Sequence, residues 1–477
     1  METISEGQHL IIHKLPEIFQ QRYGKVPKQI FVRECYIRLY KTVSDKMVNG
    51  EMEYGVMLFT GVPGIGKSMF LIYFIYRFLH DNQFKDKQFA LEFQQGLYLS
   101  FKPTPDDATV FLCTSKRAEL IQPKNFLLLC DIHDTLPPFS RAKWTFIFSS
   151  PAPARYREML KHFPSCKYIM PTWSEQELMF VEADISKWYD NFVLFGGVPR
   201  HVLHGSASHN MLKEALAEKG GAIAENFFKF SFGAVDSLQN YILVHINPPL
   251  VAVAGDGDGE DNFDYKGETV YSFASDYIFQ WLVSKNNAQM LAGAVGMFNA
   301  GAASEAYGAV SAGNLFEKIC LWLKPLNGQH ISAASLDQSF AEPLLIVVPE
   351  DRHVLAHNWK KTAQLPVNML ILPHICNLES GDAFFVAPCG SDRFLLVIFQ
   401  ITVATSHPVK INGLHDILLA FPENVRSKIT QKFLVFVVPK HCPLDKAQTL
   451  YTQKNSHAKL VPNIVKGFKQ YVYRHII

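Results

Sequence analysis

The sequence lacks the cysteine patterns of a metal site or of a disulfide framework. Its eight cysteines, at positions 35, 113, 130, 166, 320, 376, 389 and 442, form no CxxC pair and no group with histidine at zinc spacing. A zinc finger and a small disulfide-rich scaffold are therefore excluded. The scattered pattern predicts free thiols in a reducing compartment.

Long apolar runs and a strong net charge are lacking as well. The longest apolar run, around residues 69–79, is shorter than the roughly 20 residues that span a bilayer, so it predicts a buried helix and no membrane protein. The N-terminal stretch METISEGQHLIIHKLPEIF shows no secretory signal pattern. With a formal net charge of +2, any basic surface for nucleic acid has to be local.

The composition is that of a folded protein with more than one core. Hydrophobic residues make up 48% of the chain and charged residues 19%. A length of 477 residues predicts two or three domains. Unbroken apolar strands such as FLLLC (126–130) and TFIFSS (145–150) predict an α/β fold, because strands of this kind are buried on both faces of a parallel sheet.

A glycine-rich motif lies between the first strong strand and a long helix. Gly61, Gly64, Gly66, Lys67 and Ser68 complete the pattern G-x-x-x-x-G-K-[ST], in the strand-to-helix context that the motif requires. In such a loop, backbone N–H groups surround the phosphates, the lysine reaches the β and γ phosphates, and the serine binds Mg²⁺. The motif predicts a nucleotide site for ATP or GTP, because no motif for reading the base is present.

A carboxylate is needed at the end of a neighbouring strand to hold the Mg²⁺ ion, and Asp131 directly follows FLLLC. Hydrolytic ATPases with an extra strand between the two motifs usually place glutamate next, whereas this sequence has Ile132. Three interpretations stay open: Asp134 orients the attacking water, a residue from elsewhere in the chain orients it, or hydrolysis is slow. A helix cap before Pro137 is an equally weighted role for Asp134.

Three further positions are candidates for contact with the γ-phosphate. Ser150, with Ser149, ends the strand where such ATPases place a polar sensor. Arg155 and Arg157 follow, either as a source of positive charge or as part of a solvated helix face. The turn FGGVPR fixes Arg200 where it reaches back over the nucleotide or simply faces solvent.

The order of motifs resembles a known family. The stretches GVPGIGKSMFLIYFIYRFL, SSPAPARYREMLKHF, YIMPTWSEQEL and LFGGVPRHVL together resemble the P-loop NTPase module of Crinkler effectors and the related retrotransposon hot spot proteins. The resemblance covers roughly residues 50–205. It implies an AAA- or STAND-like parallel sheet with a helical lid, followed by a restriction-endonuclease-like α/β domain.

The predicted domains follow from this resemblance. We expect an N-terminal helical cap at 1–50, the NTPase domain at 51–205, a helical lid and linker at 206–312, and the nuclease-like domain at 313–477.

The resemblance implies a Mg²⁺-dependent nuclease site in the last domain. Glu317 on a helix, with Asp382 and Gln400 at adjacent strands, match the carboxylate and amide positions, and Asp382 is the expected metal ligand. The usual E-x-K triplet is replaced by Gln400-Ile401-Thr402, so no lysine stands at its normal place. His407 or Lys410 is the expected substitute.

The functional hypothesis is a Crinkler-like effector in which ATP binding, with slow hydrolysis, controls a nuclease acting on double-stranded DNA. The family resemblance implies secretion and a place in the host nucleus. The alternative is a non-catalytic, nucleotide-switched scaffold whose degenerate nuclease domain binds DNA or host nuclear proteins. A ring-forming ATPase, with Arg155 or Arg157 acting across subunits, is a third reading.

Overall fold

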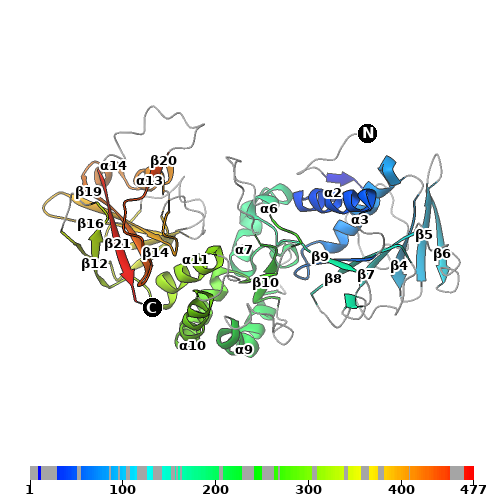
Figure 1. The fold of residues 1–477 in the computed structure, drawn as a ribbon, viewed down its shortest axis with the longest axis horizontal. Helices are drawn as coiled ribbons and strands as arrows, with labels where there is room; N and C mark the ends of the chain where they lie inside the picture. The colour runs from blue at the N-terminus through cyan, green and yellow to red at the C-terminus, as the bar shows by residue number, and fades with distance from the viewer. Residues whose placement is uncertain are drawn as a thin grey trace. The chain divides into compact units, whose positions relative to one another are not determined.

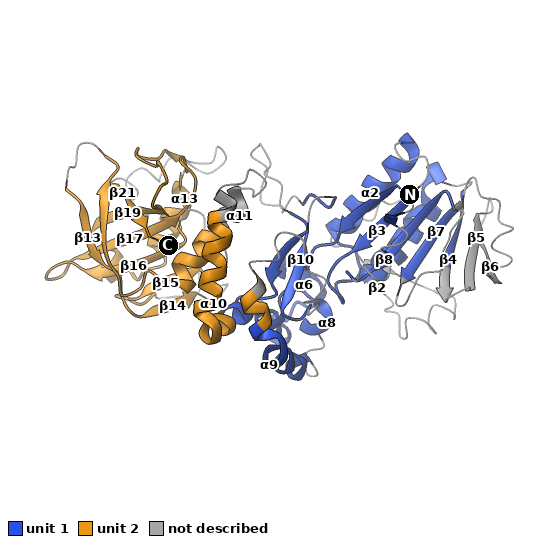
Figure 2. Ribbon diagram, turned by 60° about the horizontal axis from the view of Figure 1, so that its bottom comes forward, with its two compact units in different colours: residues 1–221, 231–279 blue, residues 222–230, 280–477 orange. Residues whose placement is uncertain are grey.

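The computed structural model (Figure 1) describes most of the chain. The described residues are 9–11, 29–50, 55–84, 87–94, 97–103, 108–114, 126–132, 142–151, 156, 160–161, 164–203, 208–227, 241–249, 263–266, 269–302, 309–337, 342–355, 365–373, 381–407, 409–451 and 467–476. The chain divides into two compact units, of residues 1–221 with 231–279 and of residues 222–230 with 280–477 (Figure 2). Each is described by itself.

The main sheet of the first unit is built around parallel strands. Among the described residues, seven strands pair in the order β6-β5-β4-β7-β8-β3-β9, and β4, β7, β8, β3 and β9 are parallel to one another. Its strands are β3 (Gly55–Thr60), β4 (Gln88–Gln94), β5 (Leu97–Pro103), β6 (Ala108–Thr114), β7 (Phe126–Ile132), β8 (Trp144–Ser149) and β9 (Ser165–Ile169).

Helices and two small antiparallel pairs complete the first unit. The pairs are β1 (His9–Ile11) with β2 (Gln29–Phe31) and β10 (Val244–Asn247) with β11 (Val270–Phe273). The helices are α2 (Glu34–Asn49), α3 (Lys67–His80), η1 (Asn82–Phe84), α6 (Glu175–Val181), η3 (Ile185–Lys187), α7 (Tyr189–Phe195), α8 (Pro199–Val202) and α9 (Ser208–Asn226).

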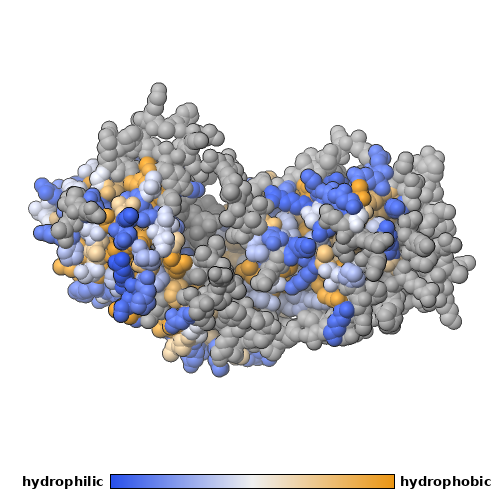
Figure 3. All heavy atoms as spheres, viewed as in Figure 1, coloured by the Kyte–Doolittle hydropathy of each residue, from blue (hydrophilic) through white to orange (hydrophobic). Residues whose placement is uncertain are grey.

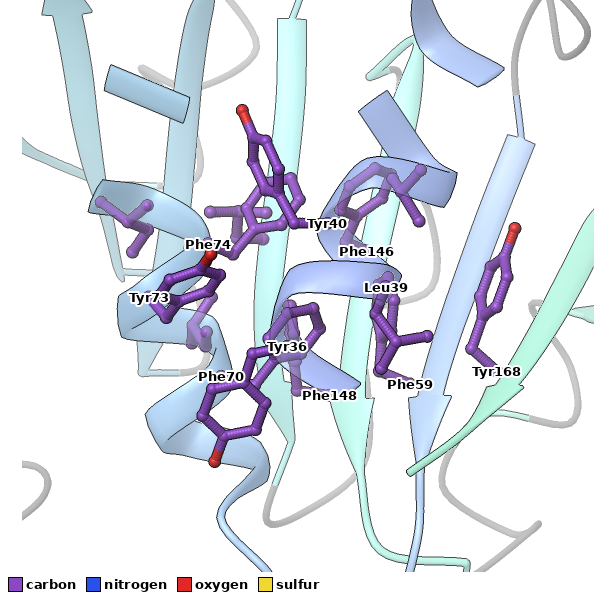
Figure 4. Packing of buried hydrophobic residues seen from close by; sticks show 14 of the residues in the cluster. Tyr36, Leu39, Tyr40, Phe59, Phe70, Tyr73, Phe74, Phe146, Phe148 and Tyr168 are labelled. Carbon is purple, nitrogen blue, oxygen red and sulfur yellow. The ribbon is translucent and has the colours of Figure 1, made fainter. Parts of the chain in front are cut away.

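Aromatic side chains hold α2 and α3 on one face of this sheet. Phe59 of β3 stacks on Phe148 of β8 and on Tyr168 of β9, with ring centroids 4.9 and 5.4 Å apart. Figure 4 shows the layer of side chains of α2 and α3 that pack on these rings and on Phe146 of β8, namely Tyr36, Leu39, Tyr40, Phe70, Tyr73 and Phe74. Large rings bury much apolar area and prefer tilted or edge contacts, so this layer fixes how the two helices lie on the sheet.

The structure confirms the predicted strands at 126–130 and 145–150, as β7 and β8, and corrects the sheet in two respects. Strand β4 was not predicted, and β5 and β6 pair antiparallel, so the sheet is mixed. The reason is that β4, β5 and β6 follow one another through short connections, which favour antiparallel pairing. Strands β2, β10 and β11 lie in stretches whose pattern predicts helix.

The second unit contains another mixed sheet. Among the described residues, eight strands pair in the order β13-β12-β21-β19-β17-β16-β15-β14. They are β12 (His330–Ser335), β13 (Leu344–Val347), β14 (Arg352–Leu355), β15 (Leu370–Pro373), β16 (Ala383–Pro388), β17 (Phe394–Ile401), β19 (Ile429–Pro439) and β21 (Phe468–His475). Strands β17, β19 and β21 are parallel, and β16 runs antiparallel to β17.

The other elements of this unit include a π-helical turn. The helices are α10 (Asp276–Ala302), which begins within the first unit, α11 (Ala309–Lys318), the π-helical segment η6 (Ile319–Leu323), α13 (Ile411–Leu419) and α14 (Glu423–Arg426). Strands β18 (Val409–Lys410) and β20 (Leu450–Tyr451) form a short parallel pair. A π-turn at the end of an α-helix is rare and is frequent at functional sites.

The core of the second unit is made by alternate residues of its central strands. Leu396 and Ile398 of β17 and Phe436 of β19 pack against Leu414 and Ile417 of α13. None of the helices in the described part of the chain combines the length and hydropathy needed to span a bilayer. On the face drawn in Figure 3, hydrophilic and hydrophobic side chains are interspersed over the coloured residues.

Two buried histidines predict how stability depends on pH. His245 of β10 and His475 of β21 are 3% and 2% exposed. Burial, assisted by His201, lowers the pKa of His245 to about 3, and burial, assisted by Lys324, lowers the pKa of His475 to about 4. Below pH 6.5, roughly where unfolded histidine titrates, the unfolded chain takes up protons that the fold excludes, so stability falls as the pH falls.

We expect the second unit of the wild type to lose about 1.4 kcal/mol per pH unit through His475 between about pH 6 and 4.5. In His475→Gln this contribution to the slope disappears. Urea unfolding at several pH values measures the slope, and His330→Gln, a change of an exposed side chain in the same unit, is the control. Equal slopes for His475→Gln and the wild type would contradict the prediction.

Candidate functional site

The glycine-rich loop of residues 61–66 connects the end of β3 to the start of α3. Gly64 and Gly66 have φ angles of 92° and 102°, which favour glycine. A Cβ atom on Gly66 would lie 2.5 Å from Tyr36 Oη, and one on Gly64 would lie 2.9 Å from Arg200 Cβ. Glycine is therefore required at both positions by backbone conformation and by the neighbouring side chains.

Lys67 opens α3 and lies over this loop. The residue is 9% exposed, and its Nζ donates hydrogen bonds to Gly61 O at 2.8 Å and to Val62 O at 3.0 Å. The ammonium group is thus bonded to carbonyls of the loop itself. Ser68 follows in the first turn of α3 and is half-buried.

Asp131 lies at the same edge of the sheet as the loop. Leu127 and Leu129 of β7 belong to the core under α3, and strand alternation places Asp131 on that face. Strand β8 lies between β7 and β3, and Asp131 pairs in register with Phe148 of β8. The Asp131 side chain is 6% exposed, so a carboxylate is buried at the carboxyl edge, one strand removed from the loop strand.

Two hydroxyl groups end the strands next to Asp131. Thr60 and Ser149 are 0% and 1% exposed, and neither hydroxyl has a hydrogen-bond partner among the described residues. Both belong to the alternation of the opposite face, where Leu58 and Ile147 are buried. Ser150, the predicted sensor, comes directly after β8 and is half-buried.

The turn Gly196-Gly197 brings Arg200 to the loop. Gly197 O accepts a 2.7 Å hydrogen bond from Trp173 N, and the Cβ and Nε atoms of Arg200 lie 2.9 and 3.4 Å from the Cβ position of Gly64. Arg200 is nevertheless exposed to solvent. The structure therefore brings together the loop, Lys67, Ser68 and Arg200. Asp134, Arg155 and Arg157 lie outside the described residues.

Several residues that contact the loop were not predicted from the sequence. Trp173 Nε1 donates to Ile65 O at 2.8 Å, and Tyr36 Oη donates to Gly66 O at 2.9 Å. A capping box of Ser174 and Glu177 is present at the start of α6, directly after Trp173. No local pattern links Tyr36 or Trp173 to the loop, because they are distant in the chain and approach it only in the fold.

Asp382 and Gln400 meet at one edge of the second sheet. Asp382 Oδ2 accepts hydrogen bonds from Gln400 Nε2 at 2.8 Å and from Ile401 N at 2.5 Å. Gln400 is 6% exposed, and its Oε1 has no hydrogen-bond partner among the described residues. The antiparallel pairing of β16 with β17 places the start of one strand beside the end of the other, which is why these two residues touch.

Glu317 of α11 is electrostatically close to this pair. Burial first, and the nearby Glu317 second, raise the pKa of Asp382 well above its usual range, against the opposite effect of the bond from Ile401 N. Burial also raises the pKa of the Cys320 thiol, and Glu317 and Asp382 add to the rise. The structure therefore groups the predicted Glu317, Asp382 and Gln400, with Cys320 of η6 as an unpredicted neighbour.

The position of the missing lysine is occupied by a threonine next to a histidine. Thr402 N bonds Val437 O at 3.0 Å, so the strand pairing extends to Thr402, and alternation places its side chain on the face of Gln400. Thr402 Oγ1 and His407 Nδ1 are 3.4 Å apart, and burial lowers the pKa of His407. Lys410 lies farther along, at the N-cap of α13.

The oxygen atoms at the edge of the second sheet differ from the ligands of a metal site that is built from carboxylates alone. Within the described ranges, no three His, Cys, Asp or Glu side chains are grouped so as to hold a metal ion. The oxygens grouped at the second edge are the carboxylates of Glu317 and Asp382 and the amide Oε1 of Gln400. Oxygen donors of this kind are the ligands that Mg²⁺ prefers, and the buried Oε1 has no hydrogen-bond partner among the described residues, so these three side chains are the ones that would hold a hard cation.

These features define a two-unit α/β protein with a glycine-rich loop and a strand-end aspartate in one unit and an acidic strand edge in the other. No protein-family model matches the chain. An alignment of 189 positions, which covers 37% of the chain, is 31% identical to Crinkler effector protein 15 and likewise to Crinkler effector protein 16 of Phytophthora infestans. The chain spans 29% and 28% of the length of these curated relatives. The similarity supports a Crinkler-like family.

The raised pKa of Asp382 predicts that Asp382→Asn stabilises the second unit at neutral and higher pH. A carboxyl group whose pKa is raised by folding makes its full contribution to the free energy of unfolding below about pH 3.8, where it is protonated in both states. That contribution is lost as the pH rises toward the pKa of the folded state. Asparagine stays neutral, so its advantage grows with pH, to about 1–3 kcal/mol. Gln400 can reverse its amide, because Oε1 has no partner in the described structure.

Urea unfolding of wild type and Asp382→Asn at pH 5, 7 and 8.5 measures this difference. Asp445→Asn, which changes an exposed carboxyl of the same unit, is the matched control and should show no comparable gain. A variant that is less stable than wild type at pH 8.5 would show that the carboxylate is not strained.

Proposed function

We propose that the first unit is a P-loop NTPase module that binds MgATP at the loop of residues 61–66. The main support is that the loop, the buried Lys67 and the buried Asp131 all lie at the edge of the sheet where the parallel strands β3 and β7 end, with β8 between these two strands. Backbone N–H groups at a helix start favour phosphate, and a lysine point charge suits it. Ser68 and Asp131 would hold the Mg²⁺ ion, which supplies charge neutralisation between the phosphates.

The same geometry supports slow hydrolysis. Ile132, rather than a carboxylate, follows Asp131, so no acid next to Asp131 in the described strand can orient water. Lys67 Nζ donates to Gly61 O and Val62 O, so a phosphate contact through either of these N–H groups requires a change of hydrogen-bond partners. Arg200, next to Gly64 and open to solvent, is free in conformation to approach the γ-phosphate. A nucleotide-dependent switch fits these features better than rapid turnover.

Lys67→Ala should weaken ATP binding about 10- to 100-fold, because hydrogen bonds to a charged group contribute roughly 1.5–3 kcal/mol. Titration of the full chain with a fluorescent ATP analogue in Mg²⁺ measures this, and GTP in parallel identifies the base preference. Lys41→Ala removes an exposed lysine of the same unit and should bind as wild type does. Equal affinities for all three proteins would rule out the proposed site.

We further propose that the second unit is a restriction-endonuclease-like domain that cuts double-stranded DNA with Mg²⁺. The support is the grouping of Glu317, Asp382 and Gln400 at the edge where β17 ends, with the buried Gln400 Oε1 lacking a donor in the described part of the chain. Asp382, Gln400 and Glu317 would hold the ion, which polarises the scissile phosphate when bound. His407, kept neutral by burial, is the group able to accept a proton from water.

Asp382→Ala combined with Glu317→Ala should abolish Mg²⁺-dependent cleavage of supercoiled plasmid DNA. Asp445→Ala, at an exposed position in the same unit, should cut as the wild type does. If the double variant and the wild type nick DNA equally well, the nuclease assignment is wrong. If the wild type binds DNA but does not cut it, the second candidate function applies.

That second candidate is a nucleotide-switched scaffold that binds DNA or host nuclear proteins without cutting. The presence of Thr402 where a lysine is expected favours it. In either case the similarity to Crinkler effectors supports an effector role, with secretion and action in a host nucleus as part of the proposal. ATP binding in the first unit would control the activity of the second.

A further inference from the structure

Two consecutive carbonyl groups of the glycine-rich loop are held from outside by aromatic side chains. Ile65 O accepts from Trp173 Nε1 at 2.8 Å, and Gly66 O accepts from Tyr36 Oη at 2.9 Å. Gly66 O also accepts the first helical bond of α3, from Phe70 N at 2.9 Å. Trp173 comes from the segment before α6 and Tyr36 from α2, so two separate elements hold the loop.

Because a peptide group is planar, a hydrogen bond that fixes a carbonyl also fixes the direction of the N–H group in the same peptide. In a trans peptide, C=O and N–H point in opposite directions within one plane. Ile65 O directed toward Trp173 therefore turns Gly66 N–H away from Trp173. In the same way, Gly66 O held by Tyr36 and by α3 fixes the direction of Lys67 N–H. The φ angle of 102° at Gly66 permits this pair of orientations.

A buried arginine joins the two aromatic residues. Arg33 is 1% exposed, and its guanidinium lies 5.0 Å from the ring of Trp173 and 5.9 Å from that of Tyr36. It forms a bidentate ion pair with Glu177, with distances of 2.7 and 2.9 Å. It also donates to Pro171 O and Thr172 O at 3.1 and 3.0 Å. The segment that carries Trp173 is thereby fixed to α2, which carries Tyr36.

We propose that Trp173 and Tyr36 are positioning residues of the nucleotide site: they aim the Gly66 and Lys67 amides at the phosphates, and Arg33 keeps the two aromatic side chains in place. The proposal rests on the proposed nucleotide binding and adds which residues preorganise the phosphate cradle. A preorganised set of amides binds an anion without the cost of ordering them. The ligand part recognised is the polyphosphate, not the base.

The test compares Trp173→Phe and Tyr36→Phe with two matched controls. Trp188→Phe is the control for Trp173→Phe, because it also removes an indole N–H that donates to a backbone carbonyl, Glu182 O at 2.9 Å. Tyr40→Phe is the control for Tyr36→Phe, because it removes another tyrosine hydroxyl of α2, which donates to Asp81 Oδ2 at 3.0 Å. Both control residues are buried, and the hydrogen bonds that they lose go to Glu182 and Asp81, outside the loop of residues 61–66. Binding of MgATP and of magnesium pyrophosphate to the full chain is measured together with thermal stability.

We expect Trp173→Phe and Tyr36→Phe each to bind ATP about three- to tenfold more weakly than the wild type, as the loss of one hydrogen bond implies. The factor should be the same for pyrophosphate, and the controls should bind as wild type does even where they lower the melting temperature. Tyr36→Phe removes only a hydroxyl, so it remains informative if Trp173→Phe does not fold.

Unchanged affinity in Trp173→Phe and Tyr36→Phe, beside a loss in Lys67→Ala, would overturn the positioning role and leave the nucleotide site standing. Affinity lost equally in the controls would also overturn it, because the effect would then follow stability. If wild type and Lys67→Ala bind neither ligand, the proposed function fails and the inference fails with it.

Discussion

The pairing of strands within a sheet decides which residues meet at its edge, and both groups of candidate residues depend on this constraint. In the first unit the glycine-rich loop follows β3, and Asp131 is the penultimate residue of the parallel strand β7, with β8 between the two strands. In the second unit Gln400 is the penultimate residue of β17, and Asp382 directly precedes the antiparallel strand β16 beside it. Backbone pairing, rather than nearness in the chain, therefore sets which side chains meet.

The loop of the first unit is held by contacts that only a specific packing can provide. Arg33 is almost fully buried, so its charge has to be compensated by Glu177 and by two carbonyls. Removing one partner of such a pair leaves an uncompensated buried charge, which costs about 3–5 kcal/mol. These contacts therefore fix the segment that carries Trp173 relative to α2. Because Trp173 and Tyr36 bond the loop carbonyls, the same contacts also restrict the position of the loop.

Polar groups with incomplete pairing in the described structure gather where the sheets end. Thr60 and Ser149 in the first unit and Gln400 in the second carry buried oxygens without a hydrogen-bond donor or acceptor. Asp382 has a raised pKa, since burial and Glu317 both oppose its charge. Folded proteins usually pair such groups, and exceptions concentrate at functional sites. The apolar cores behind both edges supply the stability that permits them.

The sequence alone determined the α/β class, the buried strands β7 and β8, and the loop motif after β3, because apolar runs and glycine spacing are local signals. It did not reveal β4, or the antiparallel pairing of β5 and β6, since pairing partners are chosen by the whole sheet. Tyr36, Trp173 and Arg33 were missed for the same reason. Only the tertiary structure decided these contacts, because a hydrogen bond between distant residues depends on how packed helices and strands bring their side chains together.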